Sequence, residues 1–172
     1  WDVGIALIVV GLCILLRFRN IAFSVGAVVA LVHDTLIIMG LFSLLKNVMP
    51  FSMEIDQSFI AAILTVIGYS INDKVVIFDR IREAVGLYPN RDKRTTINEA
   101  LNSTLSRTFS TSMSTLVVLI IIFFFGGETI RGFIFAMLIG VIIGTYSSWF
   151  IATPIAYDIL KGSDAKTDEV RK

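Results

Sequence analysis

The chain has 172 residues, of which 55% are hydrophobic and only 17% charged, and its net charge is +1. Apolar runs near 20 residues in such a composition favour a membrane protein, because lipid is the simpler solvent for them. The near-neutral charge, with no Lys/Arg cluster interleaved with aromatic residues, excludes a nucleic-acid-binding surface. The single cysteine, Cys13, excludes an internal disulfide and a multi-cysteine metal site, and we interpret it as a packing residue.

Five apolar runs predict an all-α fold, a bundle of about five membrane-spanning helices. The first run ends at Leu16, and its 14 residues would rise only ~21 Å against a hydrocarbon core of ~30 Å. We therefore expect this span to begin upstream of Trp1, in a longer protein. The spans are expected at residues 1–18, 21–45, 59–78, 105–125 and 132–155, within a transmembrane domain at 1–160 that precedes a polar tail, 161–172, without regular structure.

Lys and Arg residues predict the orientation of the spans. The alternate connections 17–20, 80–107 and 161–172 hold two, six and four of the fifteen basic residues. The opposite side holds only Lys46 and Arg131. Because basic loops stay in the cytoplasm, we expect the amino end of the chain outside and the carboxyl end inside.

Gly140 and Gly144 form a Gly-xxx-Gly pair in the last predicted span. Small residues at this spacing let two helix backbones approach closely in lipid. We interpret the pair as a packing feature.

Polar groups within spans are the candidate functional residues, because an ionised side chain is costly inside a bilayer. Asp73 lies ~8 Å from the cytoplasmic end of the third span at helical rise. Tyr69 and Ser70, one turn earlier, share its face of the helix, and Asn72 and Lys74 flank it. Because desolvation and a nearby cation move a carboxyl pKa in opposite directions, a carboxyl group between the two can gain and lose a proton at physiological pH. The alternative is a structural Asp held by hydrogen bonds between helices.

Arg107 lies at the cytoplasmic start of the fourth span, where nine of thirteen residues from Ser103 to Thr115 are Ser or Thr. The third span runs inward and the fourth outward, so Asp73 and Arg107 reach comparable depths if the two helices are neighbours. We expect a salt bridge between them that forms and breaks as Asp73 titrates. Two alternatives stay open: Arg107 as a flank that reaches the headgroups, and hydroxyls that only join helices.

His33 and Asp34 are adjacent near the middle of the second span, so they must face protein or a cavity. A His is a candidate proton relay, although a structural His bonded to a neighbouring helix is an equal interpretation. One His with scattered carboxylates does not make a zinc site, so we predict no metal and no cofactor. Nucleotide-binding and hydrolase motifs are missing, and the chain is not expected to be an enzyme.

The sixteen-residue run from Gly68 to Glu83 is GYSINDKVVIFDRIRE. It closely resembles the signature of the SecF family of protein-export membrane proteins, within the wider resistance-nodulation-division (RND) superfamily. The resemblance covers nearly the whole chain up to Leu160. Further stretches agree in order and spacing: Leu31–Asp34, Leu105–Thr108, Gly126–Thr129 and Gly144–Ser148.

Members of this family have six spans with a periplasmic domain after the first. The resemblance therefore implies that this chain is spans two to six, half of an RND-type membrane domain. The signature Asp and the Arg of the following span are implicated in proton conduction in the family, which implies these roles for Asp73 and Arg107. At position 74 this chain has Lys, where the family often has a small hydroxyl residue. The pH range over which Asp73 titrates therefore stays open.

The resemblance implies a multi-pass protein of the bacterial cytoplasmic (inner) membrane. Together with SecD, either separate or fused, it would use the proton-motive force to assist polypeptide translocation by the Sec machinery. The expected partners are SecD, the SecYEG translocon, the translocating polypeptide, membrane lipids and protons, and no nucleic acid. Two alternatives are an RND-type proton-coupled small-molecule exporter and a passive structural subunit of the translocon.

Overall fold

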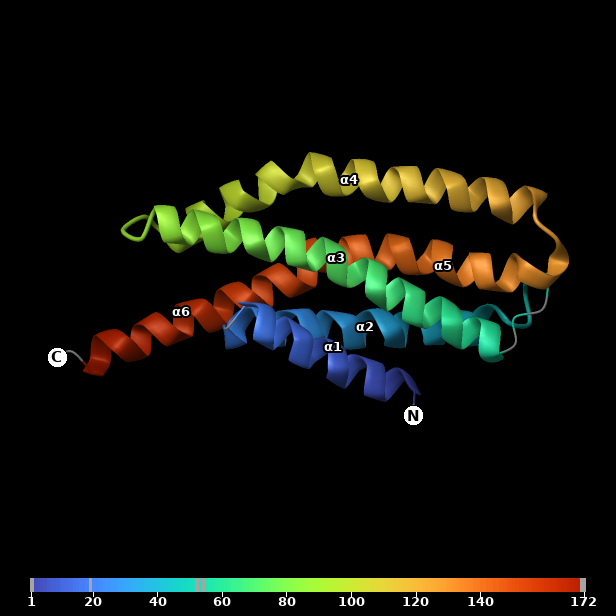
Figure 1. The fold of residues 1–172 in the computed structure, drawn as a ribbon, viewed down its shortest axis with the longest axis horizontal. Helices are drawn as coiled ribbons and strands as arrows, with labels where there is room; N and C mark the ends of the chain where they lie inside the picture. The colour runs from blue at the N-terminus through green and yellow to red at the C-terminus, as the bar shows by residue number, and fades with distance from the viewer. Residues whose placement is uncertain (1, 19, 52, 54, 171–172) are drawn as a thin grey trace.

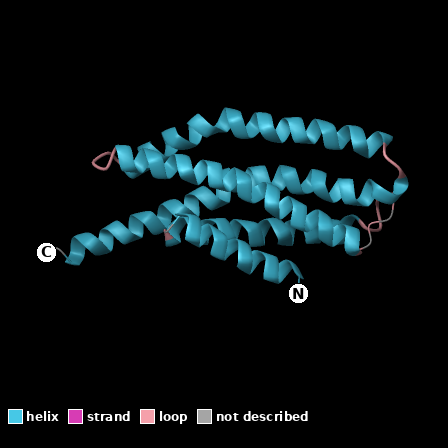
Figure 2. Cartoon of the chain, in the orientation of Figure 1, coloured by secondary structure: helices cyan, strands magenta, loops and turns pink. Residues whose placement is uncertain are grey.

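The computed structural model describes residues 2–18, 20–51, 53 and 55–170. These residues form helices joined by short connections, without a strand in the described part (Figure 2). This confirms the predicted all-α fold. The helices are α1 (Asp2–Phe18), α2 (Ile21–Leu45), α3 (Gln57–Leu87), α4 (Lys93–Phe125), α5 (Glu128–Ser147), the π-helical η1 (Ser148–Ala152) and α6 (Thr153–Val170).

Three of the helices begin at a polar side chain that caps the free backbone N–H groups of the first turn. The Asn20 side chain accepts a hydrogen bond from Ala22 N at the start of α2 (3.0 Å). Asp56 accepts one from Phe59 N at the start of α3 (2.8 Å). Asp92 accepts from Thr95 N at the start of α4 (3.1 Å). These caps fix where the chain turns back into the bundle.

The helices run up and down side by side (Figure 1). Adjacent helices α3 and α4 form an antiparallel hairpin, α5 packs against both of them, and α2 packs on the other side of α3 and α5. The α3–α4 connection and the end of α6 lie at one end of the bundle, and the α2–α3 and α4–α5 connections lie at the other (Figure 1). Successive connections thus lie at opposite ends of the bundle, as the predicted membrane spans require.

Among the residues that the structure describes, four helical segments are long and apolar enough to cross a membrane: Ile21–Leu45, Gln57–Leu87, Lys93–Phe125 and Glu128–Gly162. The first predicted span corresponds to α1, which has a shorter apolar stretch, Gly4–Leu16. With 31 and 33 residues, α3 and α4 are longer than the spans predicted within them. At ~1.5 Å per residue they exceed a ~30 Å core, so the α3–α4 hairpin extends beyond it.

The tail expected to lack regular structure continues as helix α6 to Val170, so this expectation was wrong. No proline follows Pro154, and Ala, Lys, Asp and Glu residues can extend an existing helix without a new nucleus. Residues 171–172 of the predicted tail lie outside the described part of the chain.

Small residues bring α5 against α3, as the Gly-xxx-Gly pair predicted. A Cβ atom at Gly140 would collide with the side chain of Val66, and one at Gly144 would lie 2.9 Å from Ser70 Oγ. Because Val66 and Ser70 are themselves one turn apart, two turns of α3 lie directly on two glycines of α5.

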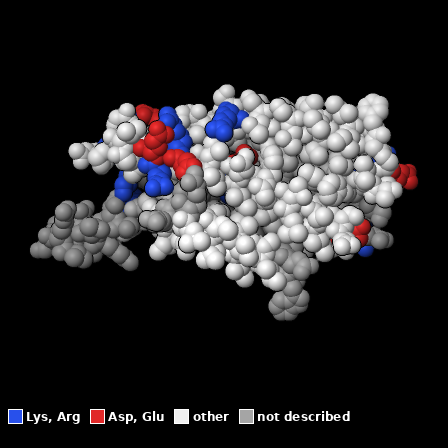
Figure 3. Space-filling view, viewed as in Figure 1, with Lys and Arg blue, Asp and Glu red and all other residues white. Residues whose placement is uncertain are grey.

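Charged side chains gather near the end of the bundle that holds the α3–α4 connection, and the middle of the visible face is nearly free of them (Figure 3). The exposed ion pairs there include Arg80 with Glu83 and Arg91 with Glu99. An apolar belt between polar ends is the surface that a membrane-spanning bundle presents to lipid and water.

Candidate functional site

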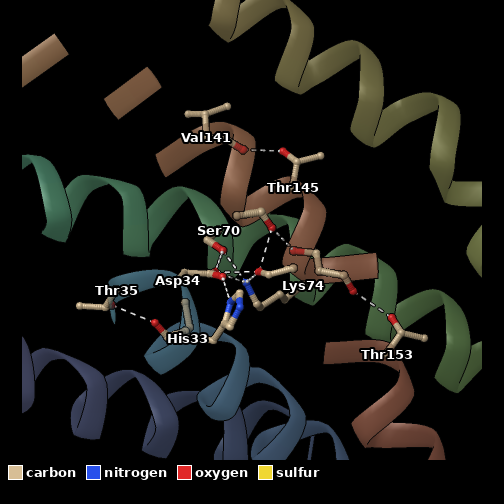
Figure 4. A network of polar contacts seen from close by, with 12 residues as sticks. His33, Asp34, Thr35, Ser70, Lys74, Val141, Thr145 and Thr153 are labelled. Carbon is tan, nitrogen blue, oxygen red and sulfur yellow. Dashed lines mark hydrogen bonds and ion pairs between the residues drawn. The ribbon is translucent and has the colours of Figure 1, made fainter. Parts of the chain in front are cut away.

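A buried ion pair joins α2 and α3 in the interior of the bundle. The Nζ atom of Lys74 lies 3.1 Å from Oδ2 of Asp34. The same oxygen accepts hydrogen bonds from Ser70 Oγ (3.1 Å) and from Ser147 Oγ at the end of α5 (2.8 Å). Three helices therefore meet at one carboxylate (Figure 4). We call these four residues, Asp34, Ser70, Lys74 and Ser147, the Asp34–Lys74 cluster.

Lys74 has no hydrogen-bonding capacity left over. Its ammonium group has three donors, and its hydrogen bonds go to Asp34, to Ser70 and, at 3.2 Å, to Ser147. The Asp34 and Lys74 side chains are 2% and 0% exposed, so the two opposite charges compensate each other away from water. The cluster is closed and electrically neutral as a unit.

Glycine and a change of helix type let α5 reach this cluster. Gly144 lies against Ser70, where a larger residue would push the two helices apart. Directly after Ser147 the chain forms η1, and Ser148 Oγ donates to Gly144 O (2.7 Å). Single π-helical turns inside α-helices recur at functional sites, and this one directs the chain from α5 into α6 next to the ion pair.

His33 lies at the edge of the cluster. Its Nδ1 is 3.3 Å from Oδ1 of Asp34, the carboxylate oxygen that does not contact Lys74. A third of the His33 side chain is exposed, so it connects a buried carboxylate with the surface of this chain. His33 and Asp34 were predicted to face protein or a cavity, and the structure places Asp34 in the protein interior.

Asp73, on α3, is a second buried carboxyl group, and it does not join the cluster. The residue is 4% exposed, and its Oδ2 atom has no hydrogen-bond partner. Successive residues of a helix point about 100° apart, so Asp73 faces away from the ion pair of Lys74. A buried polar atom without a partner is uncommon in proteins, and strain, a functional role, or a bound water or ion can account for it. The other such atom in the described residues is Trp149 Nε1.

Two hydrogen bonds show which helix Asp73 faces. Tyr69, one turn before it, donates to Ser112 Oγ of α4 (3.5 Å), and Arg80, two turns after it, donates to Ser103 Oγ of α4 (3.2 Å). Because Tyr69, Asp73 and Arg80 share one face of α3, the Asp73 carboxyl group faces α4 between these two contacts.

Arg107 lies on α4 between Ser103 and Ser112, at the level that Asp73 faces, but its side chain is exposed. The two residues, both of which the structure describes, do not form an ion pair. The salt bridge expected between Asp73 and Arg107 is therefore not made in this conformation. A long arginine side chain can keep its charged head in water while its stem lies along the helix, and the exposed Arg107 is placed in this way.

The sequence singled out Tyr69, Ser70, Asn72 and Lys74 together, and the structure separates them. Ser70 and Lys74 belong to the Asp34–Lys74 cluster, Tyr69 contacts α4, and Asn72 is exposed.

Sequence reasoning assigned no role to Ser147 and Thr145, whereas Ser112 lies in the hydroxyl-rich segment Ser103–Thr115, for which hydrogen bonds between helices were one interpretation. Ser112 and Thr145 share a hydrogen bond of 2.7 Å between α4 and α5. Ser147 and Thr145 lie in the stretch Gly144–Ser148 that carried part of the family resemblance. This was the one signal that could have found them.

The described residues contain no group of three or more His, Cys, Asp or Glu side chains arranged to hold a metal ion. The site contains two buried carboxyl groups, one ammonium group and several hydroxyl groups. Such groups can bind and transfer protons or hold helices together.

Comparisons with known proteins agree with this architecture. A family model described as "Protein export membrane protein SecD/SecF, C-terminal" matches residues 1–162. The protein translocase subunit SecF of Rhodothermus marinus is 54% identical over 154 residues, which is 90% of this chain and 50% of that protein. The protein translocase subunit SecF of Cereibacter sphaeroides is 48% identical over 133 residues, 77% of this chain and 39% of the relative.

Among solved structures, the crystal structure of SecDF in the super-membrane-facing form superposes with a TM-score of 0.83 at 36% identity. The match covers 95% of this chain and 21% of that chain. The chain thus spans at most about half the length of the two relatives described above. Its fold is that of part of the SecDF membrane domain.

Proposed function

This chain belongs to the SecD/SecF family of protein export membrane proteins, and from that membership we propose that it is the proton-coupled membrane part of a SecF-type export subunit. In this proposal it works with a SecD half in the bacterial inner membrane and assists a polypeptide that leaves through the SecYEG translocon. The relatives named as SecF translocase subunits support the role in export, and the SecDF structure supports SecD as a partner. The amino end of the chain would face the periplasm and the carboxyl end the cytoplasm.

One observation carries the proton-coupled part of the proposal: the buried, unpartnered Oδ2 atom of Asp73. A carboxylate without a partner is costly inside a membrane, and a proton removes its charge. Lys74, the nearest cation in the sequence, is committed to Asp34. Asp73 is therefore a buried carboxyl group of the described bundle whose Oδ2 atom has no partner, and protonation would remove its charge.

Arg107 has a place in the proposal as the cation on the facing helix. Arg107 is exposed in this conformation. In the proposed conformational cycle it approaches Asp73 in a different conformation of the membrane domain. A proton moving through 100 mV releases ~2.3 kcal/mol, enough to bias a two-state equilibrium of a membrane domain. The only bonds made or broken in this role are the O–H bonds of the transferred proton. The proposal therefore includes no enzymatic activity.

The Asp34–Lys74 cluster favours a second function for part of the site, that of a structural lock. It connects three helices, and the charges of Asp34 and Lys74 compensate each other within it. We propose that the Asp34–Lys74 cluster has a structural role and that Asp73 binds protons. The passive-scaffold alternative therefore applies to the cluster and not to Asp73.

An export assay in cells tests the proposal. A strain that depends on this protein is complemented with the wild type, Asp73→Asn or Asp73→Glu, and secretion of a reporter is measured with and without a proton-motive force. We expect Asp73→Asn to insert normally and lose the gradient-dependent part of secretion, and Asp73→Glu to retain some of it. Normal gradient-dependent secretion by Asp73→Asn would refute the proposed role.

A further inference from the structure

An open cavity of about 520 Å³ lies at the seam between α3 and α4. Its wall includes Asp79, Arg80 and Glu83 of α3 and Ser103, Thr104 and Arg107 of α4. Charged and hydroxyl side chains dominate this wall, and a polar cavity of this size holds water. It lies towards the end of the bundle where the charged residues gather (Figure 3).

The cavity reaches to within one helical turn of Asp73. Val76, which also lines it, is on the same face of α3 as Asp73 and three residues after it. On the facing helix, Thr104 lines the cavity and lies four residues before Thr108. Thr108 is therefore the residue of α4 that comes next as one moves from the cavity into the bundle.

Thr108 belongs to a buried row of hydroxyls on α4, together with Thr104 and Ser112, each one turn from the next. Thr104 donates to Leu101 O (2.9 Å), and Ser112 bonds to Thr145. Thr108 is the most deeply buried of these three residues, at 2% exposed. It lies between the levels of Ser103 and Ser112, which is the interval of α4 that Asp73 faces.

We propose that Thr108 relays protons between this cavity and Asp73. The inference rests on the proposed function, because it needs Asp73 as the proton site. In the inward step, Thr108 first comes within hydrogen-bond distance of Asp73 Oδ2, an atom without a partner in this conformation. A hydronium ion in the cavity then gives a proton to Thr108 Oγ1 and becomes water, while the O–H bond that Thr108 already carried breaks and its proton passes to the Asp73 carboxylate. The neutral hydroxyl and the neutral carboxyl group remain, and rotation of the hydroxyl prepares the reverse step. Thr108 is thus the group that connects an otherwise isolated acceptor with water.

Replacing the hydroxyl without changing the shape of the side chain tests the relay. The full-length protein is reconstituted with its partner half in proteoliposomes, and proton uptake is followed under an imposed potassium diffusion potential. We expect Thr108→Val to slow uptake by about tenfold or more, in line with the loss of a positioned proton-transfer group. Thr108→Ser, which keeps a hydroxyl, is expected to remain near the wild-type rate.

Thr96→Val is the matched control, because Thr96 is an equally buried threonine on the same helix and does not line the cavity. We expect it to leave proton uptake unchanged. If Thr108→Val does not fold, as judged by its melting temperature, Thr108→Ala takes its place in the comparison with Thr108→Ser. Wild-type uptake by the hydroxyl-free variant would overturn the relay while leaving Asp73 in place, whereas wild-type uptake by Asp73→Asn would overturn the proposed function itself.

Accessibility tests the cavity independently of transport. In a Cys13→Ser background, Thr104→Cys is expected to react with a charged thiosulfonate reagent added on the side of the α3–α4 connection, and Thr96→Cys is expected to react far more slowly. Equal protection of both positions would show that water does not fill the cavity and would overturn the inference.

Discussion

The ammonium group of Lys74 lies 3.1 Å from the carboxylate of Asp34, although forty residues separate them in the chain. The neighbouring carboxyl group, that of Asp73, leaves one oxygen without a partner. Asp73 and Lys74, adjacent residues of α3, therefore differ in their hydrogen bonding. One is held in a closed network, and the other is free to respond to a proton.

Removing one partner of the Asp34–Lys74 pair is expected to destabilise the bundle more than removing both. Asp34→Asn leaves an ammonium group buried without its counter-charge, and Lys74→Met leaves a carboxylate; the loss of one partner from such a pair typically costs ~3–5 kcal/mol. The double variant leaves neutral groups, so its melting temperature in detergent should lie above that of either single variant. A double variant that melts below both would contradict the neutral-pair interpretation.

The exposed pair Arg80–Glu83 is the matched control for this series. Exposed ion pairs contribute ~0–1 kcal/mol, so Glu83→Gln should hardly change the melting temperature. A loss comparable to that of Asp34→Asn would show that the assay responds to charge changes in general.

Two glycines of the bundle, Gly140 and Gly68, are expected to respond to alanine with opposite signs. Gly140→Ala places a methyl group against Val66 and should destabilise by ~1–3 kcal/mol through overpacking. A Cβ atom at Gly68 would meet no other atom within 4 Å, so Gly68→Ala should raise the melting temperature through helix propensity, worth ~1 kcal/mol. Adding Val66→Ala should partly restore the melting temperature of Gly140→Ala. If it does not, the contact with Val66 is not the cause of the destabilisation.

Asp92, in the α3–α4 connection, is expected to stabilise the start of α4 in a pH-dependent way. The hydrogen bonds from the Thr95 side chain and backbone hold the pKa of Asp92 below its ordinary value. The stabilisation from this carboxylate is then fully present above the unfolded-state pKa and is lost as the pH falls through the lower folded-state pKa. We expect Asp92→Ala to melt below the wild type at neutral pH, and the difference to shrink in strong acid. Asp92→Asn keeps a capping oxygen and should stay close to the wild type; a pH-independent difference would contradict the argument.

Labelling of single cysteines tests the orientation. In a Cys13→Ser background, Asn47→Cys lies at the α2–α3 end of the bundle and Asn90→Cys in the α3–α4 connection, and both positions are exposed. We expect a membrane-impermeant maleimide to label position 47 in intact cells and position 90 only after lysis. The reverse pattern would place the basic end outside, against the distribution of Lys and Arg.

Local rules recovered much of this molecule from the sequence. Hydrophobic run length identified the helical bundle, and Gly140 and Gly144 identified the close approach of α5, because both features are encoded by neighbouring residues. The predicted spans are shorter than α3 and α4, because hydropathy marks only the apolar part of a helix and both helices have polar ends.

The pairing within the site lay beyond sequence reasoning. Lys74 was considered beside Asp73, its neighbour in the chain, but it contacts Asp34 on another helix. That choice depends on the rotation of α3 against α2 and α5, which no short motif specifies. Ser147 was missed for the same reason, since a serine near the end of an apolar run is ordinary until a carboxylate is found 2.8 Å away.

In the proposed cycle Asp73 gains and loses a proton while Asp34 stays in its ion pair. Infrared difference spectroscopy of the reconstituted protein measures this directly, through the C=O stretching band of a protonated carboxyl group in a dry environment. We predict a pH-dependent band that disappears in Asp73→Asn and persists in the Asp34→Asn, Lys74→Met double variant. A band that survives in Asp73→Asn, or a wild-type protein without any such band, would contradict the account.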